Sequence, residues 1–559
     1  MKHEALPTRD LAALYPSLAE WERDAAQIRP HTEKFAAYRG RLAESPAVMR
    51  EAIEAQDAAS RLTAKVYTYA HLLSDEDTSN NVNRSRVDKL DALLASLSEL
   101  EAWFEPEFMK IPDGTMKKFL ASPELAFYRR SMEELLRDKP HTLSEPEERI
   151  LGILSDALGS SAGTFELLND ADLSFGSVRD GSGKVVKLTH GSYRKLMEDS
   201  DREVRRTAFR KLYRRYKEFR NTFASTLDGE IKTHAADAKL DRFYPYMELR
   251  RKMMKLDKLD MYDIYNPLLP AVTERYPFER AEELVKAALA PLGDEYVRDL
   301  DRAFKERWID APERKGKRSG AYSSGCYDSY PYLLLNYNST LDDVFTLAHE
   351  LGHSMHSFYS HRAQQYHYAG YRIFVAEVAS TTNEILLSEY LLKHAKTGEQ
   401  RAYLYGHLLD EIRGTIYRQT MFAEFELSLH RKAEAGVPFT ADELTAEYYE
   451  LNKLYYGDAV KADKLIGLEW ARIPHFYYDF YVYKYATGMS AALVLAKNLL
   501  SGDAAKREAY LGFLRAGDSK DVLDIMKDAG VDLSTPAPVA SALDYFGDTV
   551  EKLRRELGL

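Results

Sequence analysis

Apolar residues recur at helical spacing along most of this 559-residue chain. In residues 90–100, for example, leucine occupies the first, fourth, fifth, eighth and eleventh positions. Such spacing is typical of a helix that buries one face. Glycine and proline, at 29 and 20 residues, are sparse outside a few loop segments, which favours long helices. The sequence therefore predicts a mainly α fold.

Two segments interrupt this helical pattern and predict small β insertions. Residues 173–188 read as two short strands around the turn RDGSGK at 179–184. A loop rich in proline, glycine and basic residues at 311–320 leads into residues 321–337, where tyrosine, serine and leucine favour further short strands. No stretch has the composition of a flexible linker, and we place a domain boundary near residue 185.

Composition and charge exclude several classes of protein. With 45% apolar and 30% charged residues the chain has the composition of a globular protein. A formal net charge of −11 repels phosphate backbones and argues against a nucleic-acid binder. The basic run at 205–220 is interleaved with Phe209, Leu212, Tyr213 and Tyr216, so we interpret it as the solvated face of an amphipathic helix.

The single cysteine and the lack of long apolar runs indicate in which cellular compartment the protein is expected. Cys326 alone excludes an intramolecular disulfide framework, and we interpret it as a packed or incidental thiol. Residues 1–16 contain no apolar core of a signal peptide, and no apolar run approaches the ~20 residues of a membrane-spanning helix. We expect a cytoplasmic protein without a membrane partner, and the sequence leaves its oligomeric state open.

The motif His349-Glu350-Leu351-Gly352-His353 carries the clearest chemistry. It lies within residues 341–360, which read as a helix capped by Ser339 or Thr340. Residues four apart share one face of a helix, so both imidazoles can reach one tetrahedral zinc ion. Glu350 is then placed to take a proton from a zinc-bound water. Gly352 is unfavourable within a helix and indicates that another segment packs close to its backbone.

The third metal ligand has two candidates in the sequence. His356 continues the histidine stripe, but it stands about 10.5 Å along the helix from His349, so reaching the same ion would be awkward. We interpret it as a neighbour in the cleft or a packed histidine. Glu377 sits alone in an apolar run of a second predicted helix, where an ionised carboxylate needs a partner or a metal. Glu384, on a polar stripe with Glu377, is a fallback ligand or a supporting partner.

A tyrosine-rich segment near the C-terminus is a further candidate. On a helix, Tyr478, Tyr481 and Tyr485 would share one face, with His475 close by. Neutral O–H and imidazole groups are suitable donors to the oxyanion of a peptidase reaction. The same residues also fit an aromatic core stripe, and their spacing is ambiguous between helix and strand.

Several separated segments resemble the oligoendopeptidase F family, which is related to thimet oligopeptidase and neurolysin. Residues 345–357 (FTLAHELGHSMHS) are similar to the family's zinc helix, and residues 373–384 (IFVAEVASTTNE) to its third-ligand helix. Residues 470–478 (WARIPHFYY) and 479–488 are similar to its C-terminal tyrosine segment. Weaker similarity runs from about 185 to 545, whereas the first ~100 residues show little.

The resemblance implies a site and a fold. It implies one zinc ion bound by His349, His353 and Glu377, transition-state tyrosines at Tyr478 and Tyr485, and a substrate contact at His475. The implied fold is a two-lobed helical ellipsoid with a deep channel, in which residues 1–185 form an N-terminal helical lobe and 186–559 the catalytic region, with active-site helices at about 340–395.

We therefore expect a zinc-dependent oligoendopeptidase that hydrolyses internal bonds of short unstructured peptides, with Glu350 as general base. The alternatives are a zinc exopeptidase, such as a carboxypeptidase or dipeptidase, and a non-catalytic helical peptide-binding protein. The segment 320–336 before the zinc helix is either a β edge for a peptide backbone or a packing hairpin. The chain is slightly shorter than expected for the family, which leaves its specificity open.

Overall fold

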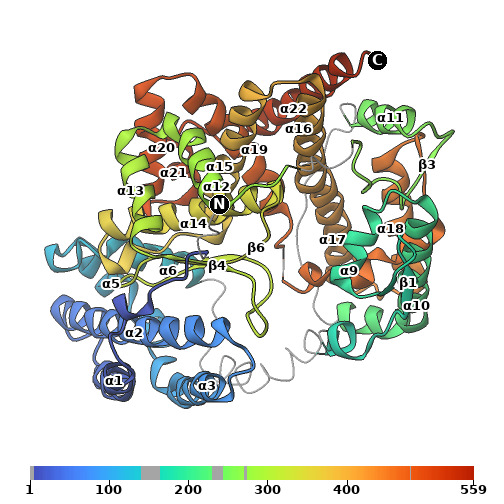
Figure 1. The fold of residues 1–559 in the computed structure, drawn as a ribbon. Coiled ribbons are helices and arrows are strands. Elements are labelled where there is room, and N and C mark those ends of the chain that lie inside the picture. Colours follow the sequence, from blue (N-terminus) through green and yellow to red (C-terminus); the bar gives the residue numbers. More distant parts are fainter. Residues whose placement is uncertain (1–5, 140–163, 166, 229–242, 270–273, 479) are drawn as a thin grey trace. The chain divides into compact units, whose positions relative to one another are not determined.

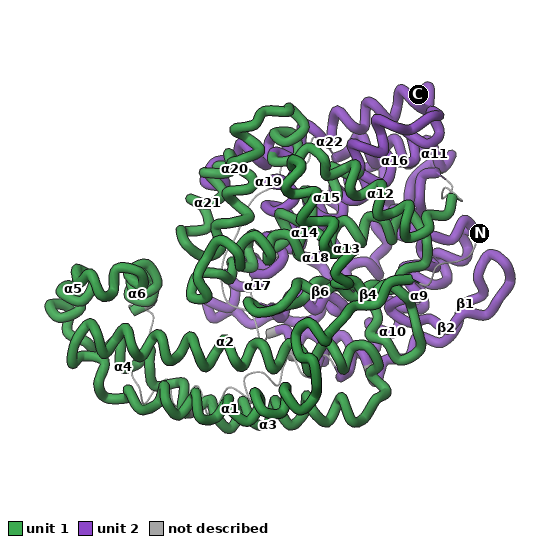
Figure 2. The backbone as a smooth tube through the Cα atoms, turned by 60° about the vertical axis from the view of Figure 1, so that its left-hand side comes forward, with its two compact units in different colours: residues 1–151, 274–387, 495–532 green, residues 152–273, 388–494, 533–559 purple. Residues whose placement is uncertain are grey.

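The computed structural model describes residues 6–139, 164–165, 167–228, 243–269, 274–478 and 480–559. It is mainly helical with a few short strands, as the sequence predicts. The chain forms two compact units, each assembled from three segments (Figure 2). Unit 1 contains residues 1–151, 274–387 and 495–532, and unit 2 contains 152–273, 388–494 and 533–559. The predicted boundary near residue 185 remains a prediction.

Unit 1 carries the N-terminal helices, a three-stranded sheet and the helix with the His-Glu-x-x-His motif. Its main elements are α1 (Leu18–Ala36), α2 (Pro46–Glu76), α3 (Asn81–Glu101), α4 (Phe104–Lys110), α5 (Asp113–Ala121), α6 (Arg129–Asp138), α12 (Phe278–Ala288), α13 (Asp294–Lys305), β4 (Ile309–Pro312), β5 (Tyr322–Ser324), β6 (Tyr332–Tyr337), α14 (Leu341–Ala363), η6 (Tyr366–Tyr368), α20 (Ala504–Ala516) and α21 (Val522–Asp528). Helix α15 (Ile373–His394) begins in this unit.

Unit 2 combines a β-hairpin with long helices. Its main elements are η4 (Leu167–Asp172), β1 (Ser177–Arg179), β2 (Val185–Lys187), α9 (His190–Met197), α10 (Arg202–Asp228), α11 (Tyr244–Met253), β3 (Leu259–Asp260), α16 (Gly398–Ile412), η7 (Arg413–Tyr417), α17 (Arg418–Glu434), α18 (Ala441–Tyr456), β7 (Val460–Lys461), η8 (Lys464–Arg472), η9 (Pro474–Tyr477), most of α19 (Tyr483–Leu500) and α22 (Ala537–Glu556).

The predicted hairpin and the predicted amphipathic helix are both confirmed in unit 2. Strands β1 and β2 pair antiparallel, with Val178 opposite Val186. The turn between them uses a positive φ at Gly183, a conformation that glycine adopts without strain. In α10 the four interleaved apolar residues are at most 1% exposed, so the basic residues from Arg206 to Arg220 form the outer face of a packed helix. Arg205, by contrast, is buried and pairs with Asp263 (2.9 Å).

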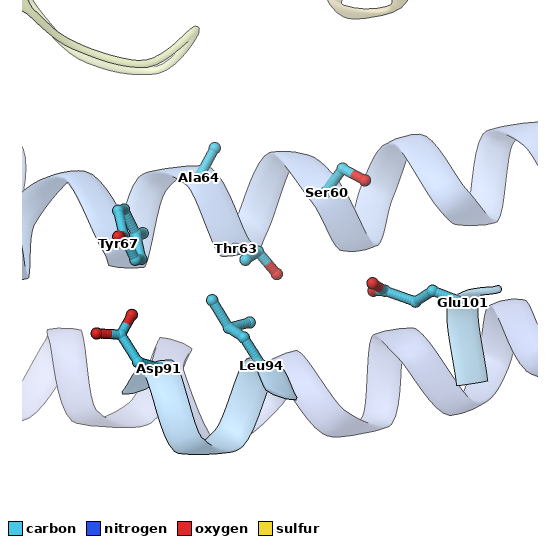
Figure 3. Close-up of a pocket in the computed structure, with 7 residues that line it drawn as sticks. All are labelled: Ser60, Thr63, Ala64, Tyr67, Asp91, Leu94 and Glu101. Carbon is cyan, nitrogen blue, oxygen red and sulfur yellow. The ribbon is translucent and has the colours of Figure 1, made fainter. Parts of the chain in front are cut away.

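The first three long helices of unit 1 lie side by side (Figure 1). Trp21 of α1 and Val66 of α2 are buried in the core they share, and the Trp21 indole donates to the Val66 carbonyl (2.9 Å). A groove of about 540 Å³ runs between α2 and α3 (Figure 3). Its lining contains the carboxylates Asp91 and Glu101 but no histidine, so it does not offer a mixed set of metal ligands.

The sheet of unit 1 has the order β4-β6-β5 and packs against the helix that follows it. The central strand β6 is apolar and almost entirely buried, which anchors the start of α14. Strand β5 pairs only with β6 in this order, so it is the sheet's edge strand nearest α14, where Ser323 and Ser354 share a hydrogen bond (2.8 Å). The predicted strands within 321–337 are therefore confirmed, and Cys326 beside them is buried as expected.

Within the described residues, none of the helices combines the length and the apolar character that crossing a membrane requires.

Candidate active site

Helix α14 presents the His-Glu-x-x-His motif from a firmly capped start. The Thr340 hydroxyl accepts from the Asp343 backbone N–H, and the Asp343 carboxylate accepts from the Thr340 backbone N–H. This reciprocal capping satisfies two backbone donors that a helix start leaves unpaired. Of the two predicted caps, Thr340 is the one observed, while Ser339 adopts a positive φ just before it.

Gly352 allows helices α14 and α15 to approach each other very closely. A Cβ atom at this position would lie 2.5 Å from Ser380 Cα and 2.8 Å from the Ala379 carbonyl oxygen. Every residue except glycine would push the second helix away, so the close packing predicted from the sequence is confirmed. The contact is reinforced by Asn383, whose amide donates to the Ala348 carbonyl (3.0 Å).

The two helices bring His349, His353 and Glu377 together. The two Nε2 atoms lie 3.2 Å apart, and Glu377 Oε2 lies 3.3 Å from the first and 3.4 Å from the second. Tetrahedral zinc with ligand bonds of about 2.0–2.1 Å requires ligand atoms about 3.3 Å apart. The three distances match that edge length, so these residues fit a zinc ion with a fourth position open. Among the described residues this is the one set of histidine, cysteine and carboxylate groups close enough to hold a metal.

Glu384 supports the first histidine from the outer side. Its carboxylate Oε1 lies 2.9 Å from His349 Nδ1, which directs the other ring nitrogen, Nε2, toward the cluster. Glu384 is a fallback ligand or a supporting partner by its place in the sequence, and its contact is that of a supporting partner. The Ser380 hydroxyl donates to Glu377 Oε2 (3.0 Å). The sequence carries no signal for this contact, because a serine three residues after a glutamate is common on a helix.

Electrostatics in the cluster favour an anionic Glu377. Burial alone raises the pKa of this carboxyl, but hydrogen bonds with His349 and His353 outweigh burial and hold the pKa well below its usual range. For His349, burial lowers the pKa, while hydrogen bonds with Glu377 and Glu384 raise it well above the ordinary value. The raised pKa of His349 favours a positive charge beside Glu377, in the place that a cation would take.

Glu350 has the environment of a general base. Its side chain is buried, and Oε2 has no hydrogen-bond partner among the described residues. Burial raises the pKa of the carboxyl, while the neighbouring His349 and His353 moderate that rise. A carboxylate with a raised pKa accepts a proton more readily, and the unpartnered oxygen is available to do so.

His356 lies away from the ligand set and is a packed histidine, one of the two interpretations made from the sequence. It is 1% exposed, and its ring stacks on Tyr371 with centroids 3.8 Å apart and also contacts Phe513. Burial is the main cause that lowers its pKa to about 3, with smaller contributions from the nearby His353 and His361. The ring is therefore neutral at physiological pH.

Neutral burial of His356 predicts a pH-dependent stability. Below its ordinary pKa of about 6.5 the unfolded chain binds a proton that the folded chain does not, so the free energy of unfolding falls as the pH drops toward 3. Between pH 7.5 and 5.5 the contribution of this residue is about 1.4 kcal/mol. His356→Phe, which keeps the ring packing, is expected to reduce the loss by that amount in urea unfolding followed by circular dichroism. Equal losses in both proteins would contradict this assignment.

The tyrosine segment belongs to unit 2, and its backbone differs from the prediction. Tyr478 and Tyr481 precede α19, and only Tyr485 lies on that helix, so a shared helical face is wrong. The reason is a break in the backbone, where η9 ends at Tyr477 and Phe480 adopts a positive φ of 50°. Asp479, also in the predicted segment, lies outside the described residues.

The tyrosine rings nevertheless gather in unit 2. Tyr481 contacts both Tyr478 and Tyr485 edge to face, with centroids 6.0 and 5.6 Å apart. His475 Nε2 lies 3.5 Å from the Tyr485 hydroxyl, and burial together with Arg418 lowers the pKa of this histidine. Tyr478 is 49% exposed, so the group is not an enclosed aromatic core.

A capped helix with two histidines and a buried glutamate, completed by a carboxylate from a second helix, defines a metallopeptidase type of site. Comparisons with known proteins agree with this class. The family model described as Peptidase family M3 matches residues 246–545, and that described as Oligopeptidase F matches residues 107–175.

Similar proteins match over nearly the whole chain. Oligopeptidase PepF of Bacillus subtilis is 39% identical over 587 residues, covering 99% of this chain and 88% of that protein. Group B oligopeptidase PepB of Streptococcus agalactiae is 37% identical, covering 97% and 96%. A crystal structure of oligoendopeptidase-F from Enterococcus faecium superposes with a TM-score of 0.74 at 34% identity, covering 97% and 99%.

The chain therefore belongs to peptidase family M3, within its oligoendopeptidase F group. It is an enzyme, a hydrolase of the metallo-endopeptidase class.

Proposed function

We propose that this protein is a zinc-dependent oligoendopeptidase that hydrolyses internal bonds of short, unstructured peptides. The observation that carries the proposal is the near-equal spacing, 3.2 to 3.4 Å, of three ligand atoms from His349, His353 and Glu377. A structural ion pair between these residues has no need of three equal distances, whereas one tetrahedral cation imposes them.

In the proposed mechanism the ligands hold the metal and Glu350 moves the proton. Zinc, when bound, lowers the pKa of a coordinated water to near 7 and polarises a carbonyl oxygen. The Glu350 carboxylate takes the proton of the attacking water, and the same group then delivers that proton to the leaving amine. The carboxylate is buried, and its Oε2 has no hydrogen-bond partner among the described residues, which supports both transfers.

We propose Tyr478 and Tyr485 as donors to the oxyanion and His475 as a substrate contact. The sequence resemblance supports these roles, as does the neutral state of His475 that follows from its lowered pKa. A phenol donates one hydrogen bond that strengthens as negative charge develops on the substrate oxygen.

Tyr485→Phe is expected to lower kcat by about 10²–10³-fold, since it removes one oxyanion donor. Zinc content is expected to stay at the wild-type level, because the substitution touches none of the proposed ligands. Steady-state kinetics with metal analysis checks both, and Tyr483→Phe, on the same turn of α19, serves as the matched control. An unchanged kcat in Tyr485→Phe would remove this residue from the mechanism.

The edge strand β5 is a suitable place for a peptide backbone. It pairs with β6 on one side, and it borders α14 close to Glu350 through the contact of Ser323 with Ser354. Extended peptides add to free strand edges by main-chain hydrogen bonds, which select for unstructured substrates. We propose this edge as the substrate strand's partner, in a cytoplasmic enzyme that acts on short peptides.

An internally quenched peptide with both termini blocked tests the proposal. We expect cleavage at an internal bond, loss of cleavage after chelation, and recovery when zinc is added back. An exopeptidase would leave the blocked peptide intact and trim only the version with free ends. That outcome, or full activity in protein shown by metal analysis to be free of metal, would overturn the proposal.

A further inference from the structure

The linker between the two proposed ligand helices is held at several points along its length. Helix α14 ends at Ala363 and α15 begins at Ile373, so residues 364–372 set where the second helix starts. Glu377 follows this linker by little more than one helical turn. A movement of the linker is therefore expected to move the proposed third ligand, because only a short stretch of helix separates the two.

His367 fixes the middle of the linker to helices α2 and α6. Its Nδ1 lies 3.0 and 3.1 Å from the two carboxylate oxygens of Asp57, and its Nε2 lies 2.8 Å from Ser131 Oγ. This order of carboxylate, imidazole and hydroxyl is that of a nucleophilic triad. However, Ser131 Oγ also lies 2.9 Å from the Tyr128 carbonyl oxygen, which competes with His367 for the single hydroxyl proton. The hydroxyl is thus bound within α6 as well as to the linker, and we interpret the contacts of His367 with Asp57 and Ser131 as a clamp.

Arg372 fixes the end of the linker to the same helix. Its guanidinium binds Asp518 through Nε (3.2 Å) and Nη2 (3.1 Å), and Nη2 also binds Glu134 (2.5 Å). Glu134 stands three residues after Ser131, on one face of α6. Helix α6 thus holds both the middle and the end of the linker.

Tyr368 adds a third contact between them. Its hydroxyl donates to the Phe127 carbonyl (2.9 Å) and accepts from the Ser131 N–H (3.3 Å), while its carbonyl accepts from the Asp518 N–H (2.9 Å). A side chain at Gly517 would collide with that carbonyl, at 2.1 Å. The linker therefore contacts both α6 and the start of the turn between α20 and α21.

Contacts of α15 with α14 restrain the part of the helix that follows Glu377. Ser380, packed on Gly352, and Asn383 both lie on that side. Before Glu377, Ile373 at the start of α15 is 53% exposed. The linker preceding it is held to α14 by Tyr371, which stacks on His356 and shares a hydrogen bond with Ser357 (2.9 Å). The restraint before Glu377 therefore comes from the linker, through this contact and through the clamp.

We infer that His367 and Arg372 are positioning residues that, through α6 and Asp57, set Glu377 against His349 and His353. This role rests on the proposed metal site. Metal ligands must lie within about 0.2 Å of their ideal distances, so loosening one end of a ligand helix weakens binding even when all three ligands remain. Loss of a side chain that hydrogen-bonds to a metal ligand typically weakens metal binding about 10–100-fold, and we expect residues one step further from the ligand at the lower end of that range.

The test measures zinc affinity by competition with a chelator, and the visible spectrum of the cobalt-substituted protein. In His367→Gln and in Arg372→Gln we expect zinc binding about 10-fold weaker than wild type, with a changed cobalt spectrum. The matched control is Arg362→Gln. Arg362 on α14 pairs with Asp299 at 3.0 Å and is 54% exposed, against 49% for Arg372. We expect the control to match the wild type.

Three outcomes are decisive. Wild-type affinity and a wild-type cobalt spectrum in Arg372→Gln, a half-exposed site that tolerates substitution, would overturn the inference even if His367→Gln failed to fold. Equal weakening in the Arg362→Gln control would do the same, because it would show a general effect of lost ion pairs. A wild-type protein that binds neither metal would instead remove the proposed function on which the inference rests.

Discussion

Replacing Glu350 by glutamine is expected to lower kcat by about 10²–10⁴-fold, the range that general-base catalysis contributes. The amide has nearly the shape of the carboxylate but cannot take a proton, so the proposed water keeps its place and loses its base. The Glu350 side chain is buried beside His349 and His353 without being part of the ligand set. We therefore expect one zinc ion per chain in the variant, as in the wild type.

The control for this prediction is Asp342→Asn, the same carboxylate-to-amide change on an exposed position of the same helix. It is expected to change kcat little, since it lies two turns before the site. Steady-state kinetics on the blocked peptide and metal analysis separate the cases. A Glu350→Gln enzyme with comparable kcat would show that another group takes the proton. Loss of zinc in the variant would show that Glu350 helps to hold the metal.

Local patterns in the sequence were sufficient for the features that depend on near neighbours in the chain. The helix of the His-Glu-x-x-His motif follows from its cap and its apolar face, and α14 starts where the cap predicts. Gly352 predicted a close neighbour because a helix otherwise disfavours glycine. The hairpin at 177–187 followed from a turn sequence between two short apolar runs.

The tyrosine segment is a case in which local sequence patterns do not predict the backbone conformation. Spacing alone predicted one helical face for Tyr478, Tyr481 and Tyr485, and the rings do gather, but through an irregular backbone. A positive φ at Phe480 is strained for an aromatic residue, and surrounding packing must hold it. No local signal marks such a residue, because its conformation is determined by contacts from elsewhere in the chain.

The clamp that holds residues 364–372 could not be predicted from the sequence for a similar reason. His367 meets Asp57 across 310 positions and Ser131 across 236. A histidine between two predicted helices has many possible partners, and only the tertiary fold selects one. By contrast, Glu377 was recognisable as a candidate ligand because an unpaired carboxylate in an apolar run demands explanation by itself.

Replacing Glu377 by alanine is expected to weaken zinc binding by more than about 100-fold, beyond the range typical of losing a partner that hydrogen-bonds to a ligand. Two ligands would remain, and the ligand atom at 3.3 and 3.4 Å from the histidine nitrogens would be gone. Chelator competition and metal analysis of the purified protein measure this, and activity is expected to vanish at limiting zinc.

Two matched variants test whether Glu377 is the third ligand. Glu384→Ala removes a carboxylate of the same helix that contacts the outer nitrogen of His349, so we expect a loss within about 10–100-fold. His356→Phe removes the histidine that sequence spacing first suggested, and we expect wild-type zinc content because its ring packs on Tyr371. We therefore expect the loss of zinc affinity to be largest for Glu377→Ala, smaller for Glu384→Ala and absent for His356→Phe. This order follows from how directly each residue contacts the proposed metal ligands. Full zinc in Glu377→Ala together with loss in His356→Phe would reverse it, and the third ligand would have to come from α14 itself.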